Sequence, residues 1–147
     1  MIEIVEMTAA HVSQIAQLEK QCFSEPWSEK SVASELDNPL SLWLAAVDGE
    51  TVVGYIGSQA VLGEADMMNV AVAESCRRQG IAERLVQTLV RKLAEKGNRC
   101  LSLEVRASNG PARALYEKLG FRQVGLRPNY YAKPREDGLI LRKEWEI

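Results

Sequence analysis

The sequence predicts an α+β (mixed α/β) fold, a single twisted mixed sheet of about six to seven strands flanked by about four helices. Its length, 147 residues, is that of one domain spanning residues 1–147. Hydrophobic residues make up 46% and charged residues 26%, as is typical of a globular protein. Short apolar runs alternate with apolar residues at helical spacing, in the order β-α-α-β-β-β-α-β-α-β-β.

The first quarter of the chain predicts a strand followed by two helices. Residues 2–6 alternate weakly between apolar and polar side chains. Thr8 is a candidate N-cap for a helix with apolar residues three and four positions apart. Ser28 can cap a second, short helix with Val32 and Leu36 on one face, and the Asn-Pro pair that follows ends it.

The middle of the chain predicts three strands and a long helix. Residues 42–47 and 51–60 are apolar runs joined by Asp48-Gly49, a strong signal for a β-hairpin. A third apolar run covers residues 65–73. Residues 81–96 then carry leucine and valine at helical spacing, which predicts a helix.

The last third predicts a parallel strand, a helix and a hairpin. Residues 101–105 form a strand, so the segment 65–105 is a β-α-β unit whose two strands run parallel. Asn109 can cap the next helix. The apolar runs 121–126 and 139–145 flank a polar stretch with two prolines, so they predict a closing hairpin with a long loop.

Charge and cysteine content exclude several classes of protein. The 18 Lys and Arg against 20 Asp and Glu give a net charge of −2, so nucleic-acid or membrane binding driven by overall charge is not expected. Three cysteines, an odd count without C-x-x-C spacing, fit neither a disulfide framework nor a zinc site, and no metal is expected. No secretory signal or membrane span is present, which favours a cytoplasmic protein.

The segment 77–82, Arg-Arg-Gln-Gly-Ile-Ala, lies between a predicted strand and the start of the long helix. Free backbone N–H groups at a helix N-terminus form a site for phosphate or pyrophosphate, and Gly80 and Ala82 would let such a ligand approach the backbone. The alternative is an ordinary strand-to-helix turn with solvated arginines. The segment alone does not separate the two interpretations.

Two further residues are candidates for proton transfer. Glu104 lies on the opposite face of its strand from Leu101, Leu103 and Val105. A carboxylate on a covered face would suit a general base, although a solvated face or an arginine partner would explain it equally well. Tyr116 lies on the next helix, where a packing role is the simpler interpretation.

The combination of motifs is more specific than any one of them. The chain has R-x-x-G-x-A at 77–82, L-E-V-R-A-S-N at 103–109 and A-L-Y-E-K-L-G-F at 114–121. This order closely resembles the Gcn5-related N-acetyltransferase (GNAT) superfamily. With P-W-S-E-K at 26–30 and N-Y-Y at 129–131, it resembles the ribosomal-protein-alanine N-acetyltransferase (RimI) type over nearly the whole chain.

The resemblance implies that acetyl-CoA is the co-substrate, with its pyrophosphate on the turn and its pantetheine arm paired with a strand. The implied cofactor-binding residues are Val70, Ala71, Val72, Arg78, Gln79, Gly80, Ile81, Ala82, Glu83 and Asn109. Glu104 matches the family's base and Tyr116 its acid, with direct transfer and no acyl-enzyme.

The implied acceptor is the N-terminal alanine amine on the tail of a small-subunit ribosomal protein. Trp27, Tyr130 and Tyr131 lie in predicted loops and could line the acceptor channel or simply pack under a loop. The basic residues near the tyrosines, Lys133 among them, could touch RNA, but a solvated loop is the simpler interpretation. The alternatives are acetylation of a lysine side chain or small-molecule amine, and a non-catalytic acyl-CoA-binding module. The presence of both Glu104 and Tyr116 disfavours the last of these.

Overall fold

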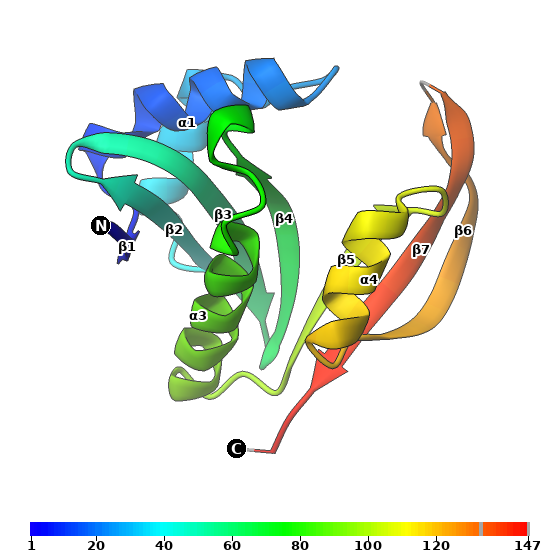
Figure 1. The fold of residues 1–147 in the computed structure, drawn as a ribbon. Helices are drawn as coiled ribbons and strands as arrows, with labels where there is room; N and C mark the ends of the chain where they lie inside the picture. Colours follow the sequence, from blue (N-terminus) through cyan, green and yellow to red (C-terminus); the bar gives the residue numbers. More distant parts are fainter. Residues whose placement is uncertain (133, 147) are drawn as a thin grey trace.

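The computed structural model describes residues 1–132 and 134–146. Within these ranges, one sheet contains seven strands in the order β1-β2-β3-β4-β5-β7-β6 (Figure 1). The elements are β1 (Ile2–Glu6), α1 (Ala9–Cys22), α2 (Glu29–Ser34), a 3₁₀ turn (Glu35–Asp37), β2 (Ser41–Asp48), β3 (Thr51–Val61), β4 (Glu64–Val72), a 3₁₀ turn (Glu74–Cys76), α3 (Ile81–Glu95), β5 (Cys100–Arg106), α4 (Gly110–Lys118), β6 (Arg122–Ala132) and β7 (Arg135–Glu144). The predicted order of strands and helices is confirmed.

Helices cover both faces of the sheet and divide the apolar core into two clusters. α1 and α2 pack on one face, and the buried members of this cluster include Ile15, Val32 and Tyr55. α3 and α4 contribute Leu85 and Tyr116 to the cluster on the opposite face. Figure 1 shows α1 and α3 on either side of β2 to β4. Because the central strands are buried on both faces, their sequences are nearly continuous apolar runs.

Local capping explains where the helices begin and end. The Thr8 N–H donates to Nδ1 of His11 at 3.0 Å at the start of α1, and Ser28 Oγ accepts from the Ser31 N–H at 3.0 Å at the start of α2. α3 is followed by Gly97, whose φ of +89° is the left-handed conformation that favours glycine. The predicted caps Thr8 and Ser28 are therefore confirmed.

The prediction that Val32 and Leu36 lie on one face of a single short helix is wrong, because α2 ends at Ser34. The chain tightens into a 3₁₀ turn after α2, which leaves Leu36 39% exposed and turns Glu35 inward to 8% exposure. The Glu35 carboxylate accepts hydrogen bonds from Trp43 Nε1 at 3.2 Å and Gln59 Nε2 at 2.8 Å. These donors compensate the burial of its polar oxygens.

The closing hairpin differs from the prediction, because β6 and β7 run through the polar stretch and leave only a short connection between Ala132 and Arg135. The register shifts between Arg127 and Tyr131, so an irregularity absorbs Pro128 within β6. β6 is an edge strand, where a missing backbone donor is tolerated. The predicted long loop is therefore wrong.

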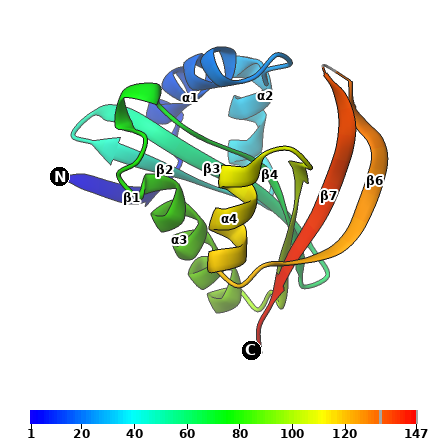
Figure 2. The same ribbon diagram turned by 45° about the vertical axis from the view of Figure 1, so that its right-hand side comes forward.

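β4 and β5 are the parallel pair, as the β-α-β unit predicts, but they pair only from Glu64↔Cys100 to Asp66↔Ser102. Beyond these three positions the two strands diverge. In Figures 1 and 2 the β1–β4 half and the β5–β7 half open away from this junction. The divergence leaves one backbone edge of β4 without a strand neighbour, and a cleft lies there.

Candidate active site

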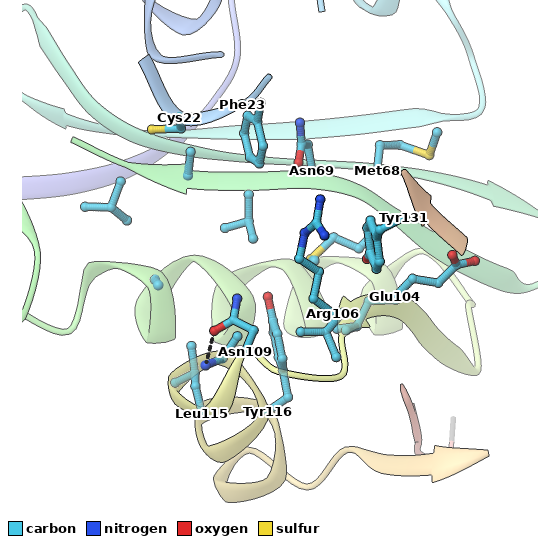
Figure 3. Close-up of a pocket in the computed structure, with 18 of the residues that line it drawn as sticks. Cys22, Phe23, Met68, Asn69, Glu104, Arg106, Asn109, Leu115, Tyr116 and Tyr131 are labelled. Atoms are coloured by element: carbon cyan, nitrogen blue, oxygen red, sulfur yellow. Dashed lines mark hydrogen bonds between the residues drawn. The ribbon is translucent and has the colours of Figure 1, made fainter. Parts of the chain in front are cut away.

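A cleft of about 1600 Å³ lies between the diverging strands. Its walls come from β4, the loop after α1, the start of α3, β5, α4 and β6. Figure 3 shows Asn69, Phe23 and Met68 on one side, with Glu104, Arg106 and Tyr116 on the other. Each segment that carries a predicted site residue reaches this cleft.

The predicted anion site is a tight turn at the start of α3. Arg78 and Gly80 have φ values of +66° and +75°, and a Cβ added to Gly80 would meet nothing within 4 Å. The space beside this glycine is therefore open to a ligand, and the first N–H groups of α3 face no side-chain cap. Arg78, Gly80, Ile81, Ala82 and Glu83 line the cleft, whereas Gln79, between Arg78 and Gly80 in the turn, is not part of the cleft wall.

The two arginines of the turn have different roles. Arg77 Nε donates to the Val72 carbonyl at 3.2 Å, and its Nη2 lies 3.6 Å from Cys22 Sγ. Arg77 therefore joins the end of β4 to the end of α1. Both arginines line the cleft, but Arg77 is held by these contacts, so Arg78 is the better placed of the two to meet an anion at the turn.

The predicted pantetheine strand, Val70 to Val72, is paired on one edge only. Val70 and Ala71 face Ile56 and Tyr55 of β3, whereas their other edge borders the cleft. An edge of this kind can accept an extended amide-bearing ligand as an added strand.

Glu104 lies in the cleft, half-buried, with its two carboxylate oxygens in different surroundings. Oε1 is 3.1 Å from Arg127 Nε, while Oε2 is buried without a hydrogen-bond partner in the described part of the chain. The arginine partner, one of the two simple explanations for this residue, is present. It contacts only one oxygen, and the other lies just beneath the cleft surface without a partner among the described residues.

Tyr116 is 4% exposed and its ring packs edge-on against Phe121 at 5.5 Å. Burial, with a smaller contribution from Tyr131, raises the pKa of Tyr116 to about 12. The phenol thus stays protonated at neutral pH and can donate a proton. Asn109 Oδ1 accepts a hydrogen bond from the Ala112 N–H at 3.2 Å and so caps α4 (Figure 3). Asn109 also lines the cleft.

The aromatic candidates all reach the cleft, but two of them are not in a loop. Trp27 lies in the loop before α2 and packs edge-on against Trp43 at 5.3 Å. Tyr130 and Tyr131 lie in β6, which corrects their predicted loop position, because β6 continues past Pro128. Interaction with the Glu104 carboxylate raises the pKa of Tyr130.

Arg106 lines the cleft and contacts Tyr131 and Glu136. Its guanidinium lies 4.3 Å from the Tyr131 ring centroid and 3.1 Å from Glu136 Oε1. Hydrogen bonds from Ser108 and Arg106 lower the pKa of Glu136. Lys133, of the predicted basic cluster, lies outside the described residues.

Comparison with known proteins identifies the family. Residues 12–121 match the sequence model of the Acetyltransferase (GNAT) family. The chain belongs to the GNAT acetyltransferase family. This confirms the family predicted from the motifs, and it makes the cleft between β4 and β5 the candidate active site of an acetyltransferase.

Individual relatives of this GNAT chain agree over nearly its full length. The Escherichia coli (strain K12) ribosomal protein bS18-alanine N-acetyltransferase is 36% identical over 142 residues, 95% of this chain and 92% of the relative. The crystal structure of the ribosomal-protein-S18-alanine N-acetyltransferase from Escherichia coli has a TM-score of 0.92 at 34% identity, covering 100% of this chain and 96% of that one. Arabidopsis thaliana NAA60 in complex with acetyl-CoA has the same fold, with a TM-score of 0.89 at 20% identity and 98% of both chains covered.

The wall of this GNAT cleft also contains residues that were not predicted as site residues from sequence, among them Cys22, Phe23, Asn69, Arg106 and Arg127. Four of these five join the site through contacts between distant segments, which leave no local pattern. Asn69 alone carried a signal, since it is a polar residue within an apolar strand. In the described part of this GNAT chain no group of three or more His, Cys, Asp or Glu side chains could hold a metal ion. None of its described helices has the length and apolar composition of a membrane span.

Proposed function

We propose that this chain transfers an acetyl group from acetyl-CoA to the N-terminal α-amine of a small-subunit ribosomal protein that begins with alanine. The observation that carries the proposal is the 36% identity, over 95% of the chain, to an enzyme named for that reaction on ribosomal protein bS18. The cleft supports it with an open backbone edge, an uncapped helix N-terminus suited to an anion, and two candidate proton-transfer groups, Glu104 and Tyr116, on one side of the cleft.

The cleft fits acetyl-CoA in two places. The open space beside Gly80 and the N-terminus of α3 suit a pyrophosphate, with Arg78 adding positive charge. The free edge of β4 at 70–72 suits the amides of the pantetheine arm. Acetyl-CoA supplies an activated acetyl thioester. A free N–H of this edge would stabilise negative charge that develops on the acetyl carbonyl oxygen.

Glu104 would act as the base. An α-amino group has a pKa near ~8, so most of it is protonated and unreactive at neutral pH. The Glu104 carboxylate, whose Oε2 has no hydrogen-bond partner among the described residues, would accept that proton, directly or through water. Arg127 holds the other oxygen and so fixes the orientation of the carboxylate.

Tyr116 would act as the acid. Its raised pKa keeps the proton on the phenol until the leaving thiolate needs it. The single histidine, His11, caps α1 and is not in the cleft wall. Direct transfer of the acetyl group from acetyl-CoA to the amine is therefore the simpler mechanism, and it requires no cysteine nucleophile.

Trp27, Tyr130 and Tyr131 would form the acceptor channel, since Trp27 lines the cleft from the loop before α2 and the two tyrosines line it from β6. We infer that the reaction takes place in the cytoplasm, and the three free cysteines of the described chain support a reducing compartment. Direct nucleic-acid binding is not part of the proposal.

The test is mass spectrometry of a peptide panel incubated with the protein and acetyl-CoA. The panel contains peptides beginning with Ala, Ser or Met, and N-terminally blocked peptides with an internal lysine. Acetylation of the alanine-first peptide at its α-amine supports the proposal. Acetylation of only the internal lysine, or no product with any peptide while acetyl-CoA still binds, would overturn it.

A further inference from the structure

Glu19, on α1, is a fully buried carboxylate that the proposed chemistry does not use. Its exposure is 0%. Oε1 accepts from the Trp27 N–H at 2.8 Å, and Oε2 accepts from Asn69 Nδ2 at 2.6 Å and from the Tyr55 hydroxyl. No Lys, Arg or His of the described residues forms an ion pair with Glu19, so neutral donors alone compensate its burial.

These bonds decide which way the Asn69 amide faces. A carboxylate only accepts hydrogen bonds, so Asn69 must present its nitrogen to Glu19. Its carbonyl oxygen, Oδ1, is then directed away from Glu19. Within the described part of the chain Oδ1 has no hydrogen-bond partner, and it is not among the buried unpaired atoms. Asn69 lines the cleft beside Phe23, opposite Arg106 and Tyr131 (Figure 3).

The backbone around Asn69 is shaped to place this side chain. The β3–β4 register shifts between Gly57↔Asn69 and Ser58↔Met67, which leaves Met68 as an extra residue in β4. A bulge of this kind re-aims the side chains beside it. Asn69 therefore lies within the free edge of β4, which begins after Asp66, the last residue paired with β5.

We propose that Asn69 binds the α-amine of the acceptor through Oδ1, and that Glu19 is the positioning residue that holds this oxygen toward the cleft. The inference rests on the proposed function and adds a second amine contact to it. An amine that attacks a carbonyl directs its lone pair at the carbon, and its N–H groups need acceptors elsewhere. The Glu104 carboxylate accepts one N–H of the amine, and Asn69 Oδ1 accepts the other.

Glu19→Gln tests the positioning role, because it changes one acceptor oxygen into a donor nitrogen. Asn69 can restore a hydrogen bond to that nitrogen only by turning its own nitrogen toward the cleft, where it repels the amine. We expect kcat/KM for the acceptor peptide to fall about tenfold, the effect of one lost hydrogen bond, with the KM for acetyl-CoA unchanged. Asn69→Ala should cause a similar fall.

The double variant, Glu19→Gln with Asn69→Ala, should be no slower than Asn69→Ala alone if Glu19 acts through Asn69. Additive losses would overturn the positioning role, because Glu19 would then act through the Trp27 loop. Glu35→Gln is the matched control, since Glu35 is another buried carboxylate held by neutral donors, but outside the cleft wall. It should lower the thermal unfolding midpoint as Glu19→Gln does and leave both kinetic constants unchanged.

An acceptor peptide methylated on the backbone nitrogen of its second residue identifies the group that Asn69 binds. If Asn69 binds the α-amine, Asn69→Ala has the same effect on this peptide as on the parent peptide. If Asn69→Ala slows the parent peptide but not the methylated peptide, Asn69 binds the peptide N–H of the second residue, and the proposal is overturned. An active wild-type protein whose Asn69→Ala variant is equally fast overturns this inference alone. A wild-type protein that acetylates no α-amine overturns the proposed function.

Discussion

The guanidinium of Arg127 lies 3.1 Å from Oε1 of Glu104 and leaves Oε2 of the same carboxylate buried, with no hydrogen-bond partner among residues 1–132 and 134–146. A buried oxygen that lacks a donor is costly to the folded protein, so such an atom calls for an explanation. Here the oxygen lies in the wall of the cleft that would receive an amine. The contact with Arg127 therefore orients the carboxylate while engaging only one of its two oxygens.

Replacing Glu104 with glutamine should lower kcat/KM for the alanine-first peptide about a hundredfold near pH 7, because general-base assistance is lost. The deficit should shrink as the pH approaches about 9, since more of the acceptor amine is then already unprotonated. Steady-state rates over this pH range measure the effect. Glu64→Gln, on the same sheet but outside the cleft wall, is the control and should leave the rate unchanged. A deficit that is constant with pH would argue against the base role.

Replacing Tyr116 with phenylalanine should lower kcat by about ten- to a hundredfold, because the leaving thiolate loses its proton donor. The affinity for acetyl-CoA, measured by calorimetry, should hardly change, since the ring and its contact with Phe121 remain. The loss should be the same at every pH up to about 10, because the pKa of Tyr116 is raised to about 12. An unchanged rate would leave Tyr116 with a packing role only.

The raised pKa of Tyr116 also predicts how stability depends on pH. A tyrosine whose pKa is higher in the folded than in the unfolded protein stabilises the fold while it is protonated. This contribution is complete below an unfolded pKa of about 10 and is lost as the pH rises through about 12. Denaturant unfolding between these values should show a falling free energy of unfolding, and Tyr116→Phe should make the fall less steep. It should not abolish the fall, because burial and Glu19 also raise the pKa of Tyr55.

Replacing Gly80 with valine should weaken acetyl-CoA binding about tenfold or more, because the added side chain occupies the open space at the N-terminus of α3. Gly97→Val is a matched control: Gly97 also has positive φ and open surroundings, but lies at the other end of α3. Both variants should be destabilised by similar backbone strain. Calorimetry should show weaker binding in Gly80→Val alone, and equal affinities would remove the pyrophosphate assignment.

Replacing Gly57 with alanine should destabilise the fold by about 1–3 kcal/mol, because the added Cβ would overlap the Trp43 ring. The nearest ring atom would be only 2.3 Å away. Gly110→Ala, where a Cβ meets nothing within 4 Å, should have little effect on chemical denaturation. Normal stability in Gly57→Ala would contradict this packing.

The sequence alone predicted much of the fold and part of the site. Hydrophobic periodicity and capping residues such as Ser28 and Asn109 predicted the order of strands and helices, because these signals depend on neighbours within a few residues. The hairpin of β6 and β7 was predicted with too long a loop, since a bulge at an edge strand can absorb a proline that would otherwise end a strand.

The sequence by itself determined the element order, the tight turn at Gly80 and the motifs that carry Glu104 and Tyr116. Only the tertiary structure decided that β4 and β5 separate after three paired positions, that Arg127 holds one oxygen of Glu104, and that Glu19 turns the amide of Asn69. The physical reason is the range of the forces. Helix and turn preferences act between residues close in the chain, whereas Glu19 and Asn69 are 50 positions apart and meet only when α1 packs against the sheet.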